Sequence, residues 1–461
     1  MATHLKRIFD AEAYETSPVQ SWWEDSAPPL SFEAPALDGE AKADVVIIGA
    51  GYTGLSAALE LVHRHGMDVV VLDAARPGWG ASGRNGGFCC FGGSKFGADE
   101  LIATFGADGA RDVVRAQVEA IDTVDKRIDD LKLDVERHGR GEVLFVHRAK
   151  FVGGIKDEAK IYREALGVDA QYWENERCRE AGLPGDLWHG GLYLPHGFGL
   201  HPMKYLRGLA ETSRKAGVRI HGGSEVREVH ETADGVIVST SQGRVKGRAA
   251  LFATNGYLAE NLPEWFAGRY MPVLSNIIVT RPLSQQERAA HGWTGDMICA
   301  DTRALLHYFR VLPDGRMMFG GRGGTATDPA SLEAMHRRLR HAFDRMFPAW
   351  TQVETTHFWS GFVCLSSNRT AFIGRIPQSE RSFASLAYWG GGVSMGSWMG
   401  ERAGEMIAAS LTRSSAMKDF RFRSTIPQAF QRPTPRFPFA GFRRMGLRLA
   451  YAMFTLRDEY L

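Results

Sequence analysis

Gly49-Ala50-Gly51-Tyr52-Thr53-Gly54 follows the apolar run Val45 to Ile48 and precedes a helical pattern that starts at Leu55, so the order is strand, tight turn, helix. Glycines in this turn let the backbone approach a pyrophosphate, whose charge meets the free N–H groups at the start of the helix. A second apolar run, Val69 to Leu72, ends in Asp73, where an acid that binds a ribose is expected. The βαβ unit therefore predicts a dinucleotide site, although a glycine triplet alone would also fit an ordinary turn.

Two further glycine-rich stretches indicate which dinucleotide is bound. The first is Trp79-Gly80-Ala81-Ser82-Gly83-Arg84-Asn85-Gly86-Gly87, whose small residues permit close approach of a flat ring; a surface loop is the alternative. The second is Tyr388-Trp389-Gly390-Gly391-Gly392-Val393-Ser394-Met395-Gly396, which leads into a helical pattern at Ala403, Met406 and Ile407. Two glycine-rich stretches that each lead into a helix, separated by most of the chain, suit a long cofactor with a ring system at one end. FAD fits this description better than NAD.

With these motifs the chain resembles the D-amino-acid-oxidase-like superfamily of FAD-dependent oxidoreductases, and most closely its branch of gamma-glutamylputrescine oxidoreductases. The resemblance spans nearly the whole length. It rests on Ser21-Trp22-Trp23, Gly80 to Gly87, Ala253-Thr254-Asn255-Gly256-Tyr257, Tyr308-Phe309-Arg310, Asp314-Gly315-Arg316 and Phe319-Gly320-Gly321-Arg322. It implies a mixed α/β fold in which a Rossmann-like FAD-binding domain is interleaved with an antiparallel-sheet substrate domain.

Several separate segments are expected to bind the cofactor. They contribute Gly49, Gly51, Tyr52, Thr53, Gly54 and Asp73; Ala81, Ser82, Arg84, Asn85, Gly86 and Gly87; Val226; Ala253 and Asn255; and Gly391, Gly392, Val393, Ser394 and Met395. In the resembled family the residue that matches Val226 touches adenine through its backbone, although a buried strand valine would look the same. Relatives with covalent flavin use a cysteine where this chain has Gly361, and Cys364 is offset, so the resemblance predicts non-covalent FAD.

Cofactor and substrate segments alternate along the chain, so domain boundaries are predicted where cofactor motifs stop and resume. The FAD-binding domain is predicted over residues 1–97, 196–256 and 356–432, the substrate domain over 98–195 and 257–355, and a basic amphipathic tail over 433–461. Alternation over Val273 to Pro282 and Leu305 to Gly321 predicts antiparallel strands that form one wall of the substrate cavity. The tail could touch a membrane, but docking on the protein's own surface is favoured because Asp458 and Glu459 close it.

Flavin oxidation of an amine needs few acid–base residues, because the protein mainly places the substrate C–H near flavin N5. Tyr308, as a hydroxyl donor, and Arg310 and Arg322, as carboxylate anchors, are predicted to orient the substrate. Strand alternation puts Tyr308 and Arg310 on one face, so they can line the cavity or equally be solvated. His307 projects from the opposite face and is expected to pack there rather than act as a base.

Composition excludes several classes of protein. A length of 461 residues predicts about two domains. The 55 basic residues are nearly matched by 53 acidic residues, so the composition gives no sign of a basic surface that would bind nucleic acid. Five cysteines without a CxxC pair indicate neither a disulfide framework nor a metal site, and they fit a cytoplasmic protein. Residues 1–20 lack a leader pattern, and no segment approaches the ~18 apolar residues of a membrane span.

The expected function is FAD-dependent oxidation of an amine C–N bond, with a hydride passing to flavin N5 and the imine hydrolysed by water. The resemblance implies gamma-glutamylputrescine or a related gamma-glutamylated amine; an amino acid of the sarcosine or glycine type is the alternative. Oxygen-using relatives carry a lysine where this chain has Met317 or Met318, so oxygen and another electron acceptor both stay open. No second strand-GxGxxG-helix unit supports an NAD(P)H-using monooxygenase, and a non-catalytic flavoprotein subunit is the alternative of a different class.

Overall fold

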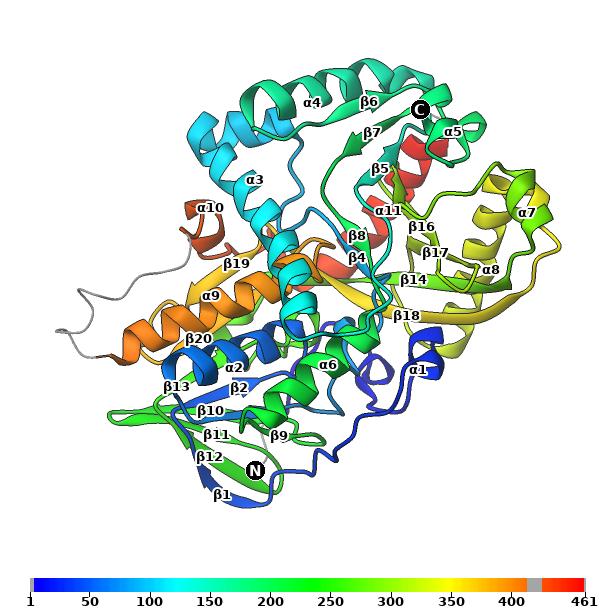
Figure 1. Ribbon diagram of the computed structural model, residues 1–461. Helices are drawn as coiled ribbons and strands as arrows, with labels where there is room; N and C mark the ends of the chain where they lie inside the picture. Colours follow the sequence, from blue (N-terminus) through cyan, green and yellow to red (C-terminus); the bar gives the residue numbers. More distant parts are fainter. Residues whose placement is uncertain (1–3, 413–424, 460–461) are drawn as a thin grey trace.

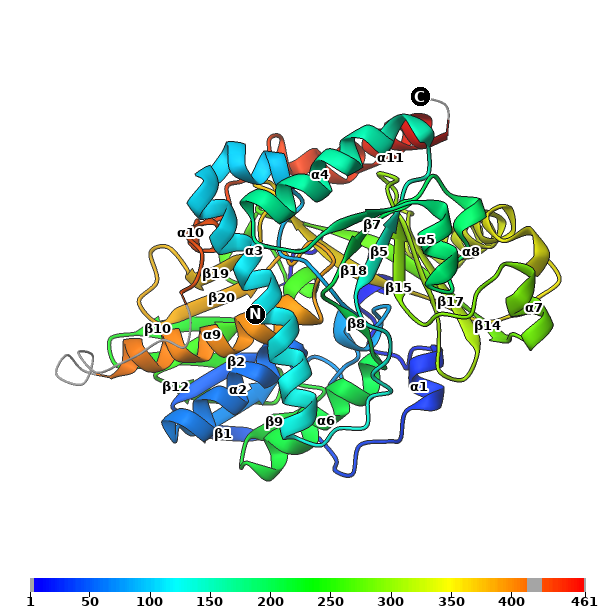
Figure 2. The same ribbon diagram turned by 45° about the horizontal axis from the view of Figure 1, so that its top comes forward.

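The computed structural model describes residues 4–412 and 425–459, and three sheets dominate it (Figure 1, Figure 2). The predicted domain and tail ranges also include residues 1–3, 413–424 and 460–461, which lie outside the described residues. Mixed helices and sheets, with a parallel cofactor-type sheet beside an antiparallel one, confirm the predicted fold class.

The predicted βαβ unit forms the centre of a six-stranded sheet. Strand β2 (Val45–Ile48) pairs in parallel with β3 (Val69–Leu72), and helix α2 (Tyr52–His65) connects them. The sheet order is β19-β20-β13-β2-β3-β9, and its other strands are β9 (Arg219–His221), β13 (Ala249–Phe252), β19 (Phe372–Arg375) and β20 (Ser382–Leu386). Both central strands are buried along their whole length, which is why they read as continuous apolar runs rather than alternating ones.

Helices and a second sheet cover the two faces of this sheet. On one face α2 packs against α9 (Ser394–Leu411) and α6 (Pro202–Lys215), as Figure 1 shows. On the other face lies a four-stranded sheet, ordered β1-β12-β11-β10. Its strands are β1 (Gly39–Lys42), β10 (Glu228–Thr232), β11 (Gly235–Ser239) and β12 (Gly243–Gly247).

An eight-stranded sheet, ordered β18-β14-β17-β16-β15-β5-β7-β6, contains the strands predicted to form one wall of the substrate cavity. Its strands are β5 (Glu142–Phe145), β6 (Gln171–Trp173), β7 (Gly191–Leu194), β14 (Tyr270–Pro282), β15 (Ile298–Asp301), β16 (His307–Val311), β17 (Arg316–Arg322) and β18 (Thr355–Ser366). One face packs an aromatic core against helix α8 (Pro329–Met346). The opposite face turns toward the six-stranded sheet (Figure 2).

Strand β18 differs from the predicted domain division. It pairs with β14 from Thr355 to Ser366, so these residues extend the eight-stranded sheet past the boundary predicted at residue 356. The chain returns to the six-stranded sheet only with β19. A small antiparallel pair, β4 (Phe88–Cys89) and β8 (Phe198–Gly199), lies next to the first glycine-rich loop.

The remaining helices include the tail, whose polar side chains contact the protein's own surface, while Phe442, Leu449 and Met453 of its apolar face are exposed, so the predicted docking holds for the polar side only. They are α1 (Trp22–Ser26), α3 (Ala98–Asp130), α4 (Val152–Ala165), α5 (Asn175–Glu180), α7 (Gln285–Ala290), α10 (Gln428–Gln431) and α11 (Arg443–Glu459). Arg443 and Arg444 form ion pairs with Glu260 and Asp10, and the Asp458 carboxylate accepts two backbone N–H bonds at 2.9 Å. Within the described ranges, no helix is both long and apolar enough for a bilayer.

A buried ion pair joins the helices that cover the six-stranded sheet. Arg127 of α3 forms a salt bridge with Glu401 of α9, and its side chain is only 9% exposed. Its guanidinium also donates to the Ser56 hydroxyl of α2 at 2.7 Å and to the Tyr205 hydroxyl of α6 at 3.4 Å. Because a buried charge needs its partners, the packing of four helices depends on Arg127.

We expect the substitution Arg127→Met to lower the free energy of unfolding by about 2–3 kcal/mol, because it removes the hydrogen bonds that join α3 to α2, α6 and α9, while Glu401 keeps its ion pair with Arg402. Urea or thermal unfolding measures the change. Arg115→Met is the matched control: Arg115 pairs with Asp112 on the exposed side of the same helix, and its loss should cost less than about 1 kcal/mol. Equal losses in the two variants would contradict the importance of the buried pair.

Candidate active site

A cavity of about 370 Å³ lies between the glycine-rich loops and the eight-stranded sheet. It collects residues from every predicted cofactor segment. Of the predicted cofactor residues, Gly49, Gly51, Tyr52, Thr53, Asp73, Ala81, Ser82, Arg84, Asn85, Gly86, Val226, Ala253, Asn255, Gly391, Gly392 and Val393 line it. Tyr308 and Arg322, predicted to orient the substrate, line it as well.

The other four predicted cofactor residues lie behind the cavity and shape its loops. A Cβ atom at Gly54 would come within 1.9 Å of the Gly49 carbonyl oxygen, and one at Gly87 within 2.0 Å of the Leu200 oxygen. The Ser394 hydroxyl donates to the Cys90 carbonyl oxygen at 2.6 Å, and Met395 is fully buried. These residues therefore hold the loops together instead of facing the cavity.

The start of α2 has the features of a pyrophosphate site. The Tyr52 backbone N–H donates to the Ser82 hydroxyl at 3.0 Å, so a side-chain oxygen already meets the positive end of the helix. Asp73 accepts hydrogen bonds from the backbone of Ala50 at 2.7 Å and Ala75 at 2.9 Å, and burial raises the pKa of its carboxyl to about 6. The βαβ motif thus brings its glycines and its acid to one end of the cavity.

Side chains fix the loop over residues 79–87. The Asn85 amide donates to the carbonyl oxygens of Ala81 and Ser82, and its own oxygen accepts the Gly87 N–H at 2.8 Å. Trp23 donates its indole N–H to the Asn85 carbonyl oxygen at 2.8 Å. The loop predicted to meet a flat ring is therefore held from several sides.

Arg310 requires a correction. The predicted role as a carboxylate anchor does not fit, because Arg310 is 1% exposed and lies outside the cavity lining. Its guanidinium donates to the carbonyl oxygens of Gly86 at 3.1 Å and Leu200 at 2.7 Å, and to Nε2 of His138 at 2.7 Å. Burial and then the charge of Arg310 lower the pKa of His138 to about 4, which keeps this imidazole a neutral acceptor. Arg310 therefore holds the loop over residues 79–87 against the eight-stranded sheet.

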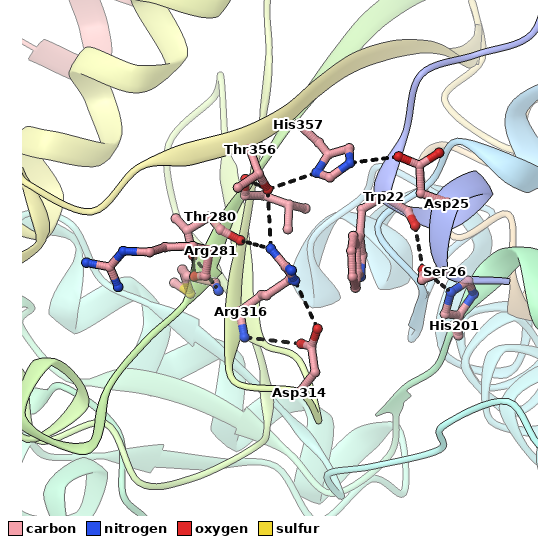
Figure 3. A network of polar contacts seen from close by, with 12 residues as sticks. Trp22, Asp25, Ser26, His201, Thr280, Arg281, Asp314, Arg316, Thr356 and His357 are labelled. Atoms are coloured by element: carbon pink, nitrogen blue, oxygen red, sulfur yellow. Dashed lines mark hydrogen bonds and ion pairs between the residues drawn. The ribbon is translucent and has the colours of Figure 1, made fainter.

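A polar network ties the N-terminal segment to the rim of the eight-stranded sheet (Figure 3). The Arg316 guanidinium lies over the Trp22 ring at 4.0 Å and donates to the Thr280 carbonyl oxygen at 2.9 Å. His357 bridges Asp25 at 3.0 Å and the Thr356 hydroxyl at 2.8 Å. These contacts explain why Ser21-Trp22-Trp23 and Asp314-Gly315-Arg316, far apart in the sequence, belong to one motif set.

The substrate end of the cavity carries a tyrosine and an arginine. The Tyr308 hydroxyl forms a 2.8 Å hydrogen bond with Ser275, and burial raises its pKa to about 12. Desolvation lowers the pKa of Arg322, yet within the described ranges its guanidinium makes no hydrogen bond and no ion pair. On the opposite face His307 pairs with Asp301 at 3.1 Å and stacks on Phe319, as expected for a packing histidine.

The residues present fit FAD. The cavity is long and reaches from the βαβ turn to Gly391 and Gly392, next to the N-terminus of α9, which is the positive end of the helix dipole. The Thr254 hydroxyl beside it is buried and has no hydrogen-bond partner among the described residues, as a group that meets a ligand would. Cys364 lines the cavity, but burial raises the pKa of its thiol, so the reactive thiolate is disfavoured.

Sequence reasoning missed Glu142, an acid that lines the same cavity from β5. The available signal was an acidic residue at the edge of the predicted strand Val143 to Val146. Burial raises the pKa of its carboxyl to about 7.

We expect Gly51→Val to abolish retention of FAD, because a Cβ atom there would lie 2.8 Å from the Ser82 hydroxyl, at the pyrophosphate site. Flavin absorbance per protein after gel filtration measures retention. Gly153→Val is the control, since a Cβ atom at Gly153 meets nothing within 4 Å. A fully loaded, yellow Gly51→Val protein would refute the assignment.

We expect Arg310→Ala to lower the free energy of unfolding by about 3 kcal/mol and to weaken FAD retention, because it strips the buried Gly86 and Leu200 carbonyl groups of their donor. Thermal unfolding and flavin content are the measurements. If the variant kept its stability and its flavin while KM for the substrate rose, Arg310 would have to be returned to the substrate site.

Comparison with known proteins agrees with this geometry. L-proline dehydrogenase from P. horikoshii superposes with a TM-score of 0.65 at 18% identity, over 82% of this chain and 96% of that one. Glycine oxidase from Geobacillus kaustophilus gives 0.64 at 16%, over 84% and 100%. These likenesses show the fold.

Curated relatives match over most of their length. The probable oxidoreductase OrdL of Haemophilus influenzae is 31% identical, over 88% of this chain and 92% of the relative. Gamma-glutamylputrescine oxidoreductase of Escherichia coli is 29% identical, over 90% and 93%. The family described as "DAO: FAD dependent oxidoreductase" matches residues 44–406. The chain therefore belongs to the DAO family of FAD-dependent oxidoreductases, and FAD is its cofactor.

Proposed function

We propose that this protein oxidises the C–N bond of gamma-glutamylputrescine or a related gamma-glutamylated amine. The observation that carries the proposal is Arg322: a cation that faces the cavity beside Tyr308 and, among the described residues, has no acidic partner of its own. A desolvated guanidinium without a counter-charge is suited to a carboxylate, which it can bind through two parallel hydrogen bonds. The 29% identity to gamma-glutamylputrescine oxidoreductase supports the same substrate class.

A second cation, Lys95, lies near Arg322 but outside the cavity lining. Desolvation and then the positive charge of Arg322 lower the pKa of Lys95 to about 8, so the two groups lie close enough to repel. Glu158 and Glu100 act in the opposite direction on Lys95, and a substrate carboxylate at Arg322 would add to their effect.

The chain's own residues would bind and orient the substrate. Bound FAD supplies the electron acceptor for the amine C–H, at N5 of its ring system. The Tyr308 hydroxyl, held by Ser275, is placed to donate a hydrogen bond to the substrate, and Arg322 would hold its carboxylate. Two contacts restrict the substrate to one orientation, and this orientation is the main contribution of the protein to the reaction. Water then hydrolyses the product imine to an aldehyde and ammonia.

The electron acceptor and the compartment belong to the same proposal. Met317 and Met318 are both fully buried, and neither brings a positive charge to the cavity to promote reaction with oxygen, so oxygen and a quinone or protein acceptor are both retained. All five cysteines are free thiols and four of them are buried, which supports a reducing, cytoplasmic compartment.

The reaction products test the proposal directly. With gamma-glutamylputrescine we expect one ammonia and one aldehyde for each amine oxidised, as measured by enzymatic ammonia assay and aldehyde trapping. Formaldehyde released from sarcosine at a higher kcat/KM would favour the amino-acid alternative. Failure of every amine to reduce the flavin would favour a non-catalytic flavoprotein.

We expect Arg322→Ala to lower kcat/KM for gamma-glutamylputrescine by about 30- to 150-fold, the value of a charge-assisted contact of about 2–3 kcal/mol. Oxidation of putrescine, which has no carboxylate, should change little. Flavin content should stay that of the unmodified protein. Loss of flavin without a change in substrate preference would move Arg322 out of the substrate site.

A further inference from the structure

Glu142 is a cavity residue that the substrate contacts proposed above leave without a role. It stands at the start of β5, and Cys90 and Phe91 lie near it in the cavity wall. The sheet explains why it faces inward. Val143 and Phe145 belong to the aromatic core on the far face, so alternation turns Glu142 and Leu144 to the cavity face.

Strand register puts Glu142 and Arg322 at opposite corners of the cavity wall. Tyr308 of β16 is paired with Gly320 of β17 and with Ala300 of β15, and Ala300 is paired with Leu144 of β5. Tyr308 and Ala300 therefore lie in the middle, with Arg322 beyond Tyr308 toward one end of the strands and Glu142 beyond Leu144 toward the other.

The separation of the two charged residues is large. Three strand spacings of about 4.8 Å and four residues of about 3.3 Å place their Cα atoms about 20 Å apart. Within the described part of the chain, Arg322 and Glu142 form no ion pair with each other or with another residue. The cavity thus has a cationic end and an anionic end.

Among the residues that the structure describes, none supplies a counter-charge to Glu142. Burial raises the pKa of its carboxyl to about 7, against a smaller opposing effect of a hydrogen bond from the Phe91 backbone. The ionisable groups coupled to it come from β4 and the loop after it, from β15 and from α4, and they are Cys89, Cys90, Cys299 and Tyr162. Burial raises the pKa of each, so all four are neutral at pH 7. Beyond Phe91 lies His196, which stacks on that ring and is near Asp122 of α3.

We propose that Glu142 forms an ammonium-binding subsite, which selects substrates whose cationic amine and carboxylate are separated by a long chain. This inference rests on the amine oxidation proposed above. Glycine and sarcosine carry amine and carboxylate on a single carbon, so they cannot reach Glu142 and Arg322 together. A gamma-glutamylated diamine can place its terminal ammonium at Glu142 and its carboxylate at Arg322. The proton that the ammonium must lose before oxidation would pass to the Glu142 carboxylate.

Substrate preference and pH dependence of Glu142→Gln test the subsite. In the unmodified holoenzyme, kcat/KM for gamma-glutamylputrescine should exceed that for 6-aminohexanoate, and both should exceed that for sarcosine. As the pH is lowered below about 7, kcat/KM for gamma-glutamylputrescine should decrease, because the Glu142 carboxyl becomes protonated and cannot pair with an ammonium. Glu142→Gln should lower kcat/KM for gamma-glutamylputrescine about thirty-fold at pH 8 and abolish this acid limb. Glu142→Asp, which keeps the charge, should retain the limb.

A matched variant separates the subsite from a general effect of buried acids. Glu158 of α4 also has a raised pKa because of burial, but it does not line the cavity, so Glu158→Gln should keep the substrate order and the acid limb. Unfolding of the flavin-free protein gives a readout other than turnover. Because burial raises the folded-state pKa of Glu142 from 4.5 to about 7, this residue lowers the stability progressively between these two pH values, with the full cost above pH 7 and almost none at or below pH 4.5. Glu142→Gln should therefore raise Tm at pH 8 and leave it unchanged at pH 4.5.

The outcomes distinguish the subsite from the proposed function. An unchanged substrate order and acid limb in Glu142→Gln, with the flavin still reduced by amines, would overturn the subsite alone. A preference of the unmodified enzyme for sarcosine over every long substrate would also overturn it. Absence of flavin reduction by any amine would instead overturn the amine oxidation on which it rests.

Discussion

The close contact between two backbone segments from opposite parts of the chain is the constraint on which the site depends. A Cβ atom at Gly92 would lie 2.3 Å from the Gly391 Cα, so neither position leaves room for a side chain. The Gly93 N–H donates to the Tyr388 carbonyl oxygen at 2.8 Å, and Ser394 bonds to Cys90. Because these loops touch, the βαβ turn, the start of α9 and the eight-stranded sheet enclose one continuous cavity.

Polar contacts outside the cavity keep that junction in place. Arg310 and Trp23 hold the first loop through the carbonyl oxygens of Gly86 and Asn85, from the sheet and from the N-terminal segment respectively. The network around Arg316 in Figure 3 fixes the N-terminal segment to the sheet in turn. Inside the cavity, by contrast, Arg322 and Glu142 are desolvated ionisable groups that form no ion pair with another described residue, which is typical of binding sites.

The sequence allowed the cofactor half of the site to be predicted closely, because its signals are local. Strand, glycine turn, helix and Asp73 lie within one short stretch, and both the fold class and the family prediction are confirmed. The substrate half depends on which strands become neighbours. The alternation of side chains along the strand placed Tyr308 and Arg310 on one face. Only the tertiary structure shows that the loop over residues 79–87 covers Arg310, while Tyr308 lines the cavity. Glu142 could not be linked to Arg322, because that link requires the order β17-β16-β15-β5.

The visible spectrum of the purified holoenzyme during anaerobic addition of gamma-glutamylputrescine tests the central claim most directly. We expect a flavin spectrum that bleaches in proportion to the amine added, because the substrate would be bound across the cavity with its C–N bond at the cofactor. Recovery of the colour in air would identify oxygen as an acceptor, and slow recovery would point to a quinone or protein. A flavin that remains oxidised with this amine and with every other amine tested would contradict the claim that the cavity is an amine-oxidising site.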